Sequence, residues 1–234
     1  MIPVTKPFLP PQEEYQRYLD GIWKRQWLTN MGPLANELEL KLKKFLNVPH
    51  LLFVTNGTVA LQMAVKALDL KAEIITTPFS FVATSSIIVW EGCTPVYVDI
   101  DPETYLIDVS KIEKAITKKT KAIIPVHLYG QPIDSDELLK IAKKYSISII
   151  EDACQSVGAE YKSKKAGNLG NAGCFSLYAT KNIMCGEGGV VTTNDKSLAD
   201  SVKRFRQHGM SGQYQYQHIG YNYRSTDLCA AIAI

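Results

Sequence analysis

Short apolar segments alternate with longer amphipathic segments along almost the whole chain, and this alternation restricts its fold more than any other feature. The short segments, such as 122–126 and 147–150, are apolar throughout. Uninterrupted apolar runs are typical of strands covered on both faces, whereas a period of 3.6 residues is typical of helices that lie against a sheet. The sequence therefore predicts an α/β fold with a mainly parallel sheet flanked by helices.

The pattern also predicts where the elements begin and end. We predict strands over residues 51–54, 73–76, 95–98, 121–127, 146–151 and 189–193. We predict helices over residues 11–24, 33–46, 58–68, 80–90, 110–116, 135–145 and 197–206. Ser110 and Glu113 have the spacing of a capping box, and residues 207–223 are predicted to form a polar loop. A last helix starts near Ser225, and because the chain stops inside it without a C-cap, we expect a truncated chain.

Composition excludes several classes of protein. With 46% hydrophobic and 21% charged residues, the 234-residue chain has the composition of a soluble globular protein. The net charge of +3 is spread over many segments, so we expect no nucleic-acid partner. No apolar run is long enough to cross a bilayer and no leader is recognisable, so we expect no membrane partner and a cytoplasmic location. Five cysteines and four histidines lack metal-ligand spacing, which predicts free thiols and no metal site.

The stretch 174–182 carries the strongest chemical signal. An apolar, aromatic run leads to Lys181, and a glycine cluster follows at Gly186, Gly188 and Gly189. A lysine at the end of a buried strand can act as a nucleophile that forms a Schiff base with a carbonyl, and glycines allow a backbone to approach another group closely. Most lysines that follow a strand are simply solvated, so this segment needs support from elsewhere in the chain.

Three further segments provide that support. Thr55-Asn56-Gly57-Thr58 joins a strand to a helix N-terminus and could bind an anion, although an ordinary capped turn has the same pattern. Glu151 and Asp152 end a buried strand; they point to opposite faces, so one can meet a ligand while the other caps or pairs. Phe81 begins a helix and could stack on a flat cofactor, although such an aromatic more often belongs to the core.

In this order along one α/β chain, these segments resemble the nucleotide-sugar aminotransferases of the DegT type, which are fold-type-I pyridoxal-phosphate enzymes. The resemblance spans nearly the whole chain. The matching runs are 55–58, 78–84, 125–132, 151–155, 175–181, 186–189 and 220–224.

The resemblance implies the aspartate-aminotransferase-like fold and the residues of a pyridoxal 5'-phosphate site. Lys181 would form the Schiff base and move protons, and Asp152 would hold the pyridine nitrogen; these two are the expected catalytic residues. Gln155 would lie near the ring hydroxyl, and Phe81 would stack on the ring. The groups expected to hold the phosphate are Gly57, Thr58, Val59 and Ser176, with Asn222 reaching the cofactor of a neighbouring subunit.

The resemblance also implies an organisation and a reaction. Residues 1–32 would form an N-terminal extended segment and helix, and residues 33–234 the cofactor-binding large domain. We expect the family's small C-terminal domain to be missing from this truncated chain. The expected reaction moves an amino group from glutamate to a keto group of a nucleotide-linked sugar in amino-sugar biosynthesis, within a homodimer that shares its sites. The segment 27–32 could touch the sugar.

Two alternatives remain at this stage. The chain could be a non-catalytic remnant or regulatory module that keeps the fold and the cofactor. It could also catalyse a different pyridoxal reaction, such as dehydration or desulfuration, for which Cys185 is the nearest candidate as a sulfur acceptor. Lysine at position 181 favours transamination over dehydration.

Overall fold

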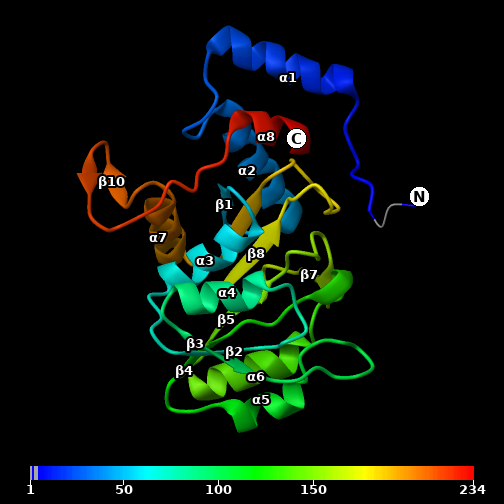
Figure 1. Ribbon diagram of the computed structural model, residues 1–234, viewed down its shortest axis with the longest axis vertical. Helices are drawn as coiled ribbons and strands as arrows, with labels where there is room; N and C mark the ends of the chain where they lie inside the picture. The colour runs from blue at the N-terminus through cyan, green and yellow to red at the C-terminus, as the bar shows by residue number, and fades with distance from the viewer. Residues whose placement is uncertain (1, 3–4) are drawn as a thin grey trace.

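The computed structural model describes residues 2 and 5–234. Its centre is a seven-stranded sheet with the order β1-β9-β8-β5-β4-β2-β3 (Figure 1). Its strands are β1 (His50–Val54), β2 (Glu73–Thr76), β3 (Thr94–Tyr97), β4 (Thr120–Ile123), β5 (Ser148–Asp152), β8 (Ala172–Ser176) and β9 (Gly189–Thr193). The pairs β2–β3, β2–β4, β4–β5 and β5–β8 are parallel, whereas β9 runs antiparallel to β1 and β8. The predicted α/β fold with a mainly parallel sheet is confirmed.

Helices cover both faces of this sheet (Figure 1). They are α1 (Gln12–Arg25), α2 (Pro33–Leu46), α3 (Gly57–Ala67), α4 (Ala83–Trp90), α5 (Val109–Ala115), α6 (Ser135–Tyr145), α7 (Lys196–Arg206) and α8 (Asp227–Ala233). One apolar cluster joins α3, α4 and α7 to one face of the sheet. On the other face, α1, α2 and α8 pack at the β1 end, and α5 and α6 pack toward the β3 end.

Several elements have the bounds that the sequence predicts, and others differ. Strands β2 and β9 and helices α2 and α6 have the predicted bounds. Helix α4 begins at Ala83 rather than residue 80. The capping box at Ser110 was a wrong prediction, because α5 is capped by Asp108, whose carboxylate accepts the Ser110 N–H.

Two short hairpins were not predicted. Strands β6 (Glu160–Tyr161) and β7 (Lys164–Lys165) pair with each other, as do β10 (Met210–Gly212) and β11 (Gln215–Tyr216). The second hairpin lies within the segment 207–223 that was predicted to be a loop, and it projects from the molecule beside α7 (Figure 1). Strands this short offer too few residues for a period-2 pattern.

The first helix shares the core of the following elements. Ile22 of α1 is fully buried in the cluster that also contains residues of α2 and α8, and the Tyr15 hydroxyl donates to the Leu228 carbonyl oxygen over 3.5 Å. The division of the chain at residue 32 stays a prediction. Within residues 2 and 5–234, no helix combines the length and the hydropathy that a bilayer crossing requires.

Candidate active site

A cavity of about 470 Å³ lies at one edge of the central sheet. Strands β1, β4, β5 and β8 all run toward this edge, so the residues that follow them converge there. Ligands of open α/β sheets bind at this edge. Seven of the nine predicted cofactor-binding residues line the cavity: Gly57, Thr58, Phe81, Asp152, Gln155, Ser176 and Lys181.

Asp152 presents a buried carboxylate to the cavity. Its Oδ2 accepts a hydrogen bond from the Thr84 hydroxyl over 2.8 Å, and its Oδ1 accepts the Cys154 N–H over 3.3 Å. The Thr84 hydroxyl is also 2.7 Å from that of Ser80. Glu151, the preceding residue of β5, instead binds His127 and the loop after β7. Of the two acids, Asp152 thus lines the cavity while Glu151 pairs with His127.

Lys181 brings an amine to the same cavity. It follows β8 in a turn in which its own N–H donates to the Tyr178 carbonyl oxygen over 2.9 Å. Its Nζ makes no ion pair with any residue that the structure describes. An amine that is held at a cavity without a carboxylate partner is available for reaction with a carbonyl compound.

The N-terminus of α3 forms the anion-binding end of the cavity. Asn56 caps this helix, because its Oδ1 accepts the Val59 N–H over 2.9 Å. The N–H groups of Gly57 and Thr58 precede the first intrahelical bond, so they remain available to an anion at the positive end of the helix dipole. The Ser176 hydroxyl lines the cavity with them.

Gln155 is held in one orientation by the backbone. Its Oε1 accepts the N–H of Tyr129 over 2.9 Å, and therefore its Nε2 is left to donate to a ligand. Tyr129 has a φ of 54°, in the left-handed region that few non-glycine residues adopt. This turn between β4 and α6 thus determines how the Gln155 carboxamide faces the cavity.

The structure does not bring every candidate into the cavity. The side chain of Val59 is buried in the core, and its N–H already binds Asn56. Asn222 lies outside the cavity, where its Oδ1 accepts two hydrogen bonds from Arg224. In the segment 27–32, Asn30 lines a separate hollow beside α7 and the β10–β11 hairpin.

Two glycines after Lys181 make close contacts with other parts of the chain rather than with the cavity. A Cβ on Gly189 would lie 2.2 Å from the Asn56 carbonyl oxygen, and a Cβ on Gly188 would lie 2.2 Å from the Cys185 sulfur. Gly189 therefore allows β9 to pack against the turn that carries the anion site, and Gly188 leaves room for the Cys185 side chain. The same contact at Gly57, where a Cβ would lie 2.7 Å from that of Ser176, seats α3 against β8.

Sequence reasoning missed Thr84 and Cys154, which line the cavity. Burial and the charge of Asp152 raise the pKa of the Cys154 thiol well above its ordinary value, while the nearby charge of Lys181 opposes this rise. Cys154 is therefore a neutral thiol in the wall of the cavity. Burial likewise raises the pKa of the Cys185 thiol, which is 1% exposed and unsuited to act as an exposed sulfur acceptor.

Comparisons with known proteins agree with this arrangement. The model of the DegT/DnrJ/EryC1/StrS aminotransferase family matches residues 11–234. The chain belongs to this family. GDP-perosamine synthase of Escherichia coli O157:H7 is 40% identical over 237 residues, which cover 100% of this chain. The family membership confirms the predicted resemblance.

Two solved structures of similar proteins have the same fold. DesI, crystallised in the presence of its TDP-sugar product, has a TM-score of 0.94 and 33% identity, over 99% of this chain and 59% of DesI. NtdA of Bacillus subtilis, with bound cofactor PMP, has a TM-score of 0.88 and 32% identity, over 100% of this chain and 56% of NtdA. The predicted fold-type-I architecture is confirmed. The chain spans less than two thirds of the length of the curated relatives it matches, for example 65% of the perosamine synthase.

Proposed function

We propose that this chain binds pyridoxal 5'-phosphate and is the cofactor-binding part of a nucleotide-sugar aminotransferase, with glutamate as amino donor and a keto-sugar as acceptor. The observation that carries the proposal is the convergence of the Lys181 amine, the Asp152 carboxylate and the N-terminus of α3 on one cavity. The PMP of NtdA and the TDP-sugar product of DesI support the cofactor and the class of substrate.

The residues around the cavity fit this cofactor in their chemistry. Gly57 and Thr58 offer N–H groups to a phosphate, and the Ser176 hydroxyl adds a third donor. Asp152 offers a carboxylate to a protonated ring nitrogen, and Gln155 offers an N–H donor to a ring hydroxyl. Phe81 lines the cavity with an aromatic face that suits a flat ring. The phosphate, the protonated ring nitrogen and the flat ring of the cofactor thus each have a matching group among the residues that line the cavity.

When bound, pyridoxal phosphate supplies a carbonyl that exchanges amino groups and a ring that withdraws electrons. The Asp152 carboxylate, oriented by the Thr84 hydroxyl, holds a proton at the ring nitrogen and so maintains this withdrawal. Lys181 is the one lysine among the described residues that line the cavity, and its amine would take a proton from the amino donor's α-carbon and deliver it to the cofactor carbon that receives the amino group. The donors at the α3 N-terminus fix the phosphate while these protons move.

The proposal includes a homodimer in which two copies share their sites. Asn222 lies outside the cavity of its own chain, which agrees with the expected contact to the cofactor of a neighbouring subunit. Phe81, which lines the cavity, is exposed, as are three further apolar side chains in or directly before α4, and such a partner would cover them; these are Val82, Val89 and Trp90. The cytoplasmic location stays a prediction from sequence.

The glutamate half-reaction tests the proposed function. Protein loaded with pyridoxal phosphate is mixed with L-glutamate in the absence of a keto-sugar. The amount of 2-oxoglutarate formed is then measured and compared with the amount of bound cofactor. We expect close to one equivalent per cofactor from the wild type and none from Lys181→Ala. Cofactor binding without formation of 2-oxoglutarate would refute transamination from glutamate by this chain and would favour the non-catalytic module.

A further inference from the structure

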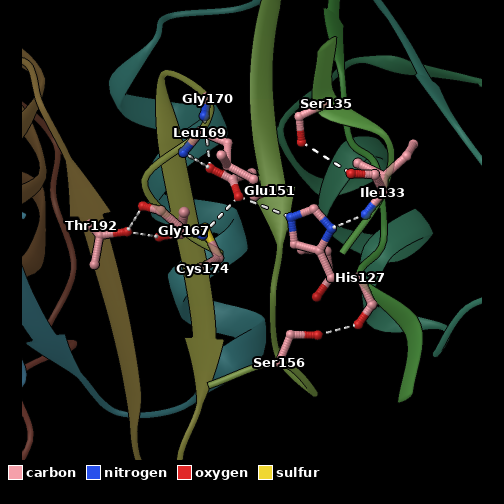
Figure 2. Close-up of polar contacts among 12 residues, drawn as sticks. His127, Ile133, Ser135, Glu151, Ser156, Gly167, Leu169, Gly170, Cys174 and Thr192 are labelled. Atoms are coloured by element: carbon pink, nitrogen blue, oxygen red, sulfur yellow. Dashed lines mark hydrogen bonds and ion pairs between the residues drawn. The ribbon is translucent and has the colours of Figure 1, made fainter. Parts of the chain in front are cut away.

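His127 and Glu151 are the centre of a buried polar network (Figure 2). Among the residues that the structure describes, neither of these two belongs to the lining of the cavity. The network connects the turn after β4, the end of β5 and the loop after β7. His127 is 0% exposed and Glu151 is 1% exposed, so neither can contact a ligand directly. In folded proteins the large majority of buried polar side-chain atoms make at least one hydrogen bond.

His127 uses both backbone groups and both ring nitrogens. Its N–H donates to the Asp152 carbonyl oxygen over 2.9 Å, and its own carbonyl oxygen accepts the Ser156 hydroxyl. Ring Nδ1 accepts the Ile133 N–H over 3.1 Å, and ring Nε2 is 2.9 Å from Glu151 Oε2. Because Nδ1 is an acceptor, the ring hydrogen is assigned to Nε2, which donates to the carboxylate.

Glu151 receives four hydrogen bonds. Oε2 accepts those of His127 and of the Gly167 N–H over 2.7 Å. Oε1 accepts the N–H groups of Leu169 and Gly170 over 2.8 and 2.7 Å (Figure 2). A carboxylate offers about four acceptor positions, so this one is saturated by N–H donors.

The network fixes two residues that the proposed function assigns to the cofactor. The backbone of Asp152 is bound on both sides, because its N–H donates to the Pro125 carbonyl oxygen over 2.9 Å while its carbonyl oxygen accepts the His127 N–H. Two residues beyond His127, the Tyr129 N–H binds Gln155 Oε1. Tyr129, in its left-handed conformation, lies within the turn that the Ile133–His127 hydrogen bond closes. His127 therefore holds the backbone of Asp152 through its N–H and, through its ring, closes the turn whose Tyr129 N–H holds the Gln155 carboxamide.

We propose that His127 is a positioning residue of the cofactor site, and that it acts as a neutral imidazole through Glu151, Asp152 and the turn that carries Tyr129. This inference rests on the proposed function for its ligand, but the positions of Asp152 and Gln155 are properties of the chain itself. Two measurements therefore apply, one without cofactor and one with it.

The first measurement is amide hydrogen exchange by NMR on the cofactor-free chain. In His127→Phe, which retains the ring shape without either nitrogen, we expect the Tyr129 and Asp152 amides to exchange about tenfold faster or more. Leu38→Ala in α2, a buried site in another core cluster, serves as the control for general loss of stability. If the exchange rates of the Tyr129 and Asp152 amides increased by the same factor in His127→Phe and in Leu38→Ala, the proposal would be overturned.

The second measurement is the affinity for pyridoxal phosphate and the midpoint of the pH titration of its visible absorption. We expect His127→Phe to bind about tenfold more weakly and to shift the midpoint, and Leu38→Ala to shift neither. If His127→Phe does not fold, His127→Gln, which can keep the donor to Glu151, and His127→Asn, which can keep the acceptor for Ile133, replace it. Each is expected to recover part of the wild-type behaviour.

The two measurements separate the possible failures. Faster exchange at Tyr129 and Asp152 with no cofactor bound by the wild type would refute the proposed function and leave the positioning role intact. Unchanged exchange and an unchanged titration midpoint in every His127 variant would show that His127 serves stability alone.

Discussion

At the scale of single residues, the acid and the lysine could be predicted from the sequence and their partners could not. Asp152 ends a strand and Lys181 follows one, so strand direction alone brings both to the same edge of the sheet. Thr84 lies 68 positions before Asp152, and no local pattern connects the two. The role of Glu151 was left open between capping and pairing, because the sequence does not say what lies behind β5.

The hydrogen bond from Thr84 gives a prediction at this scale. Thr84→Val keeps the side-chain shape but leaves a buried carboxylate oxygen without its donor, which costs about 1–3 kcal/mol of stability. We also expect weaker binding of pyridoxal phosphate, because the carboxylate loses its orientation. Thermal unfolding and a cofactor titration measure the two effects.

Thr76→Val is the matched control for that variant. The Thr76 hydroxyl is equally buried and donates to the Ile124 carbonyl oxygen over 2.9 Å, but it does not line the cavity. We expect a similar loss of stability with unchanged cofactor affinity. A loss of affinity as large as that of Thr84→Val would contradict the role given to Thr84.

At the scale of elements, the bounds of helix α2 could be predicted from the sequence pattern, but its N-terminal cap could not. Pro33 at its first position and the apolar period predicted its bounds. Its N-terminal cap is remote in sequence: Asp227 of α8 is fully buried and accepts the N–H groups of Leu34 and Ala35 over 3.2 and 3.0 Å, and it also pairs with Arg25. Such a cap depends on the tertiary fold, as does the antiparallel placement of β9.

Asp227→Ala is therefore expected to destabilise the chain strongly. It leaves two buried N–H groups and an arginine without their acceptor, and we expect a loss of about 3 kcal/mol or more in the free energy of unfolding. Asp227→Asn, which keeps one acceptor oxygen, should lose less. Urea denaturation of the three proteins measures this, and equal stability of Asp227→Ala and wild type would contradict the capping role.

At the scale of the whole molecule, buried thiols connect stability to pH. Burial and the charges of Asp152 and Glu151 raise the pKa of Cys174 well above its ordinary value of 9.0. In the unfolded chain the thiol ionises near the ordinary value, so above about pH 9 the folded state binds more protons than the unfolded state. The stabilisation is fully present below that pH and is lost as the pH rises.

Comparison with Cys174→Ala isolates this effect. Above about pH 9, the free energy of unfolding of the wild type should fall more steeply than that of the variant, by about 1.4 kcal/mol per pH unit. Between pH 7 and 8.5 the two curves should run parallel, which serves as the internal control. Parallel curves up to pH 10.5 would contradict a protonated, buried Cys174.

In the proposed site, one cavity places Lys181 against pyridoxal phosphate. The most direct test is borohydride reduction of the protein after incubation with the cofactor, followed by peptide mapping. We expect one stable label per chain, on Lys181, and a sharp loss of labelling in Lys181→Ala. Labelling of another lysine, or no label at saturating cofactor, would contradict the role proposed for Lys181.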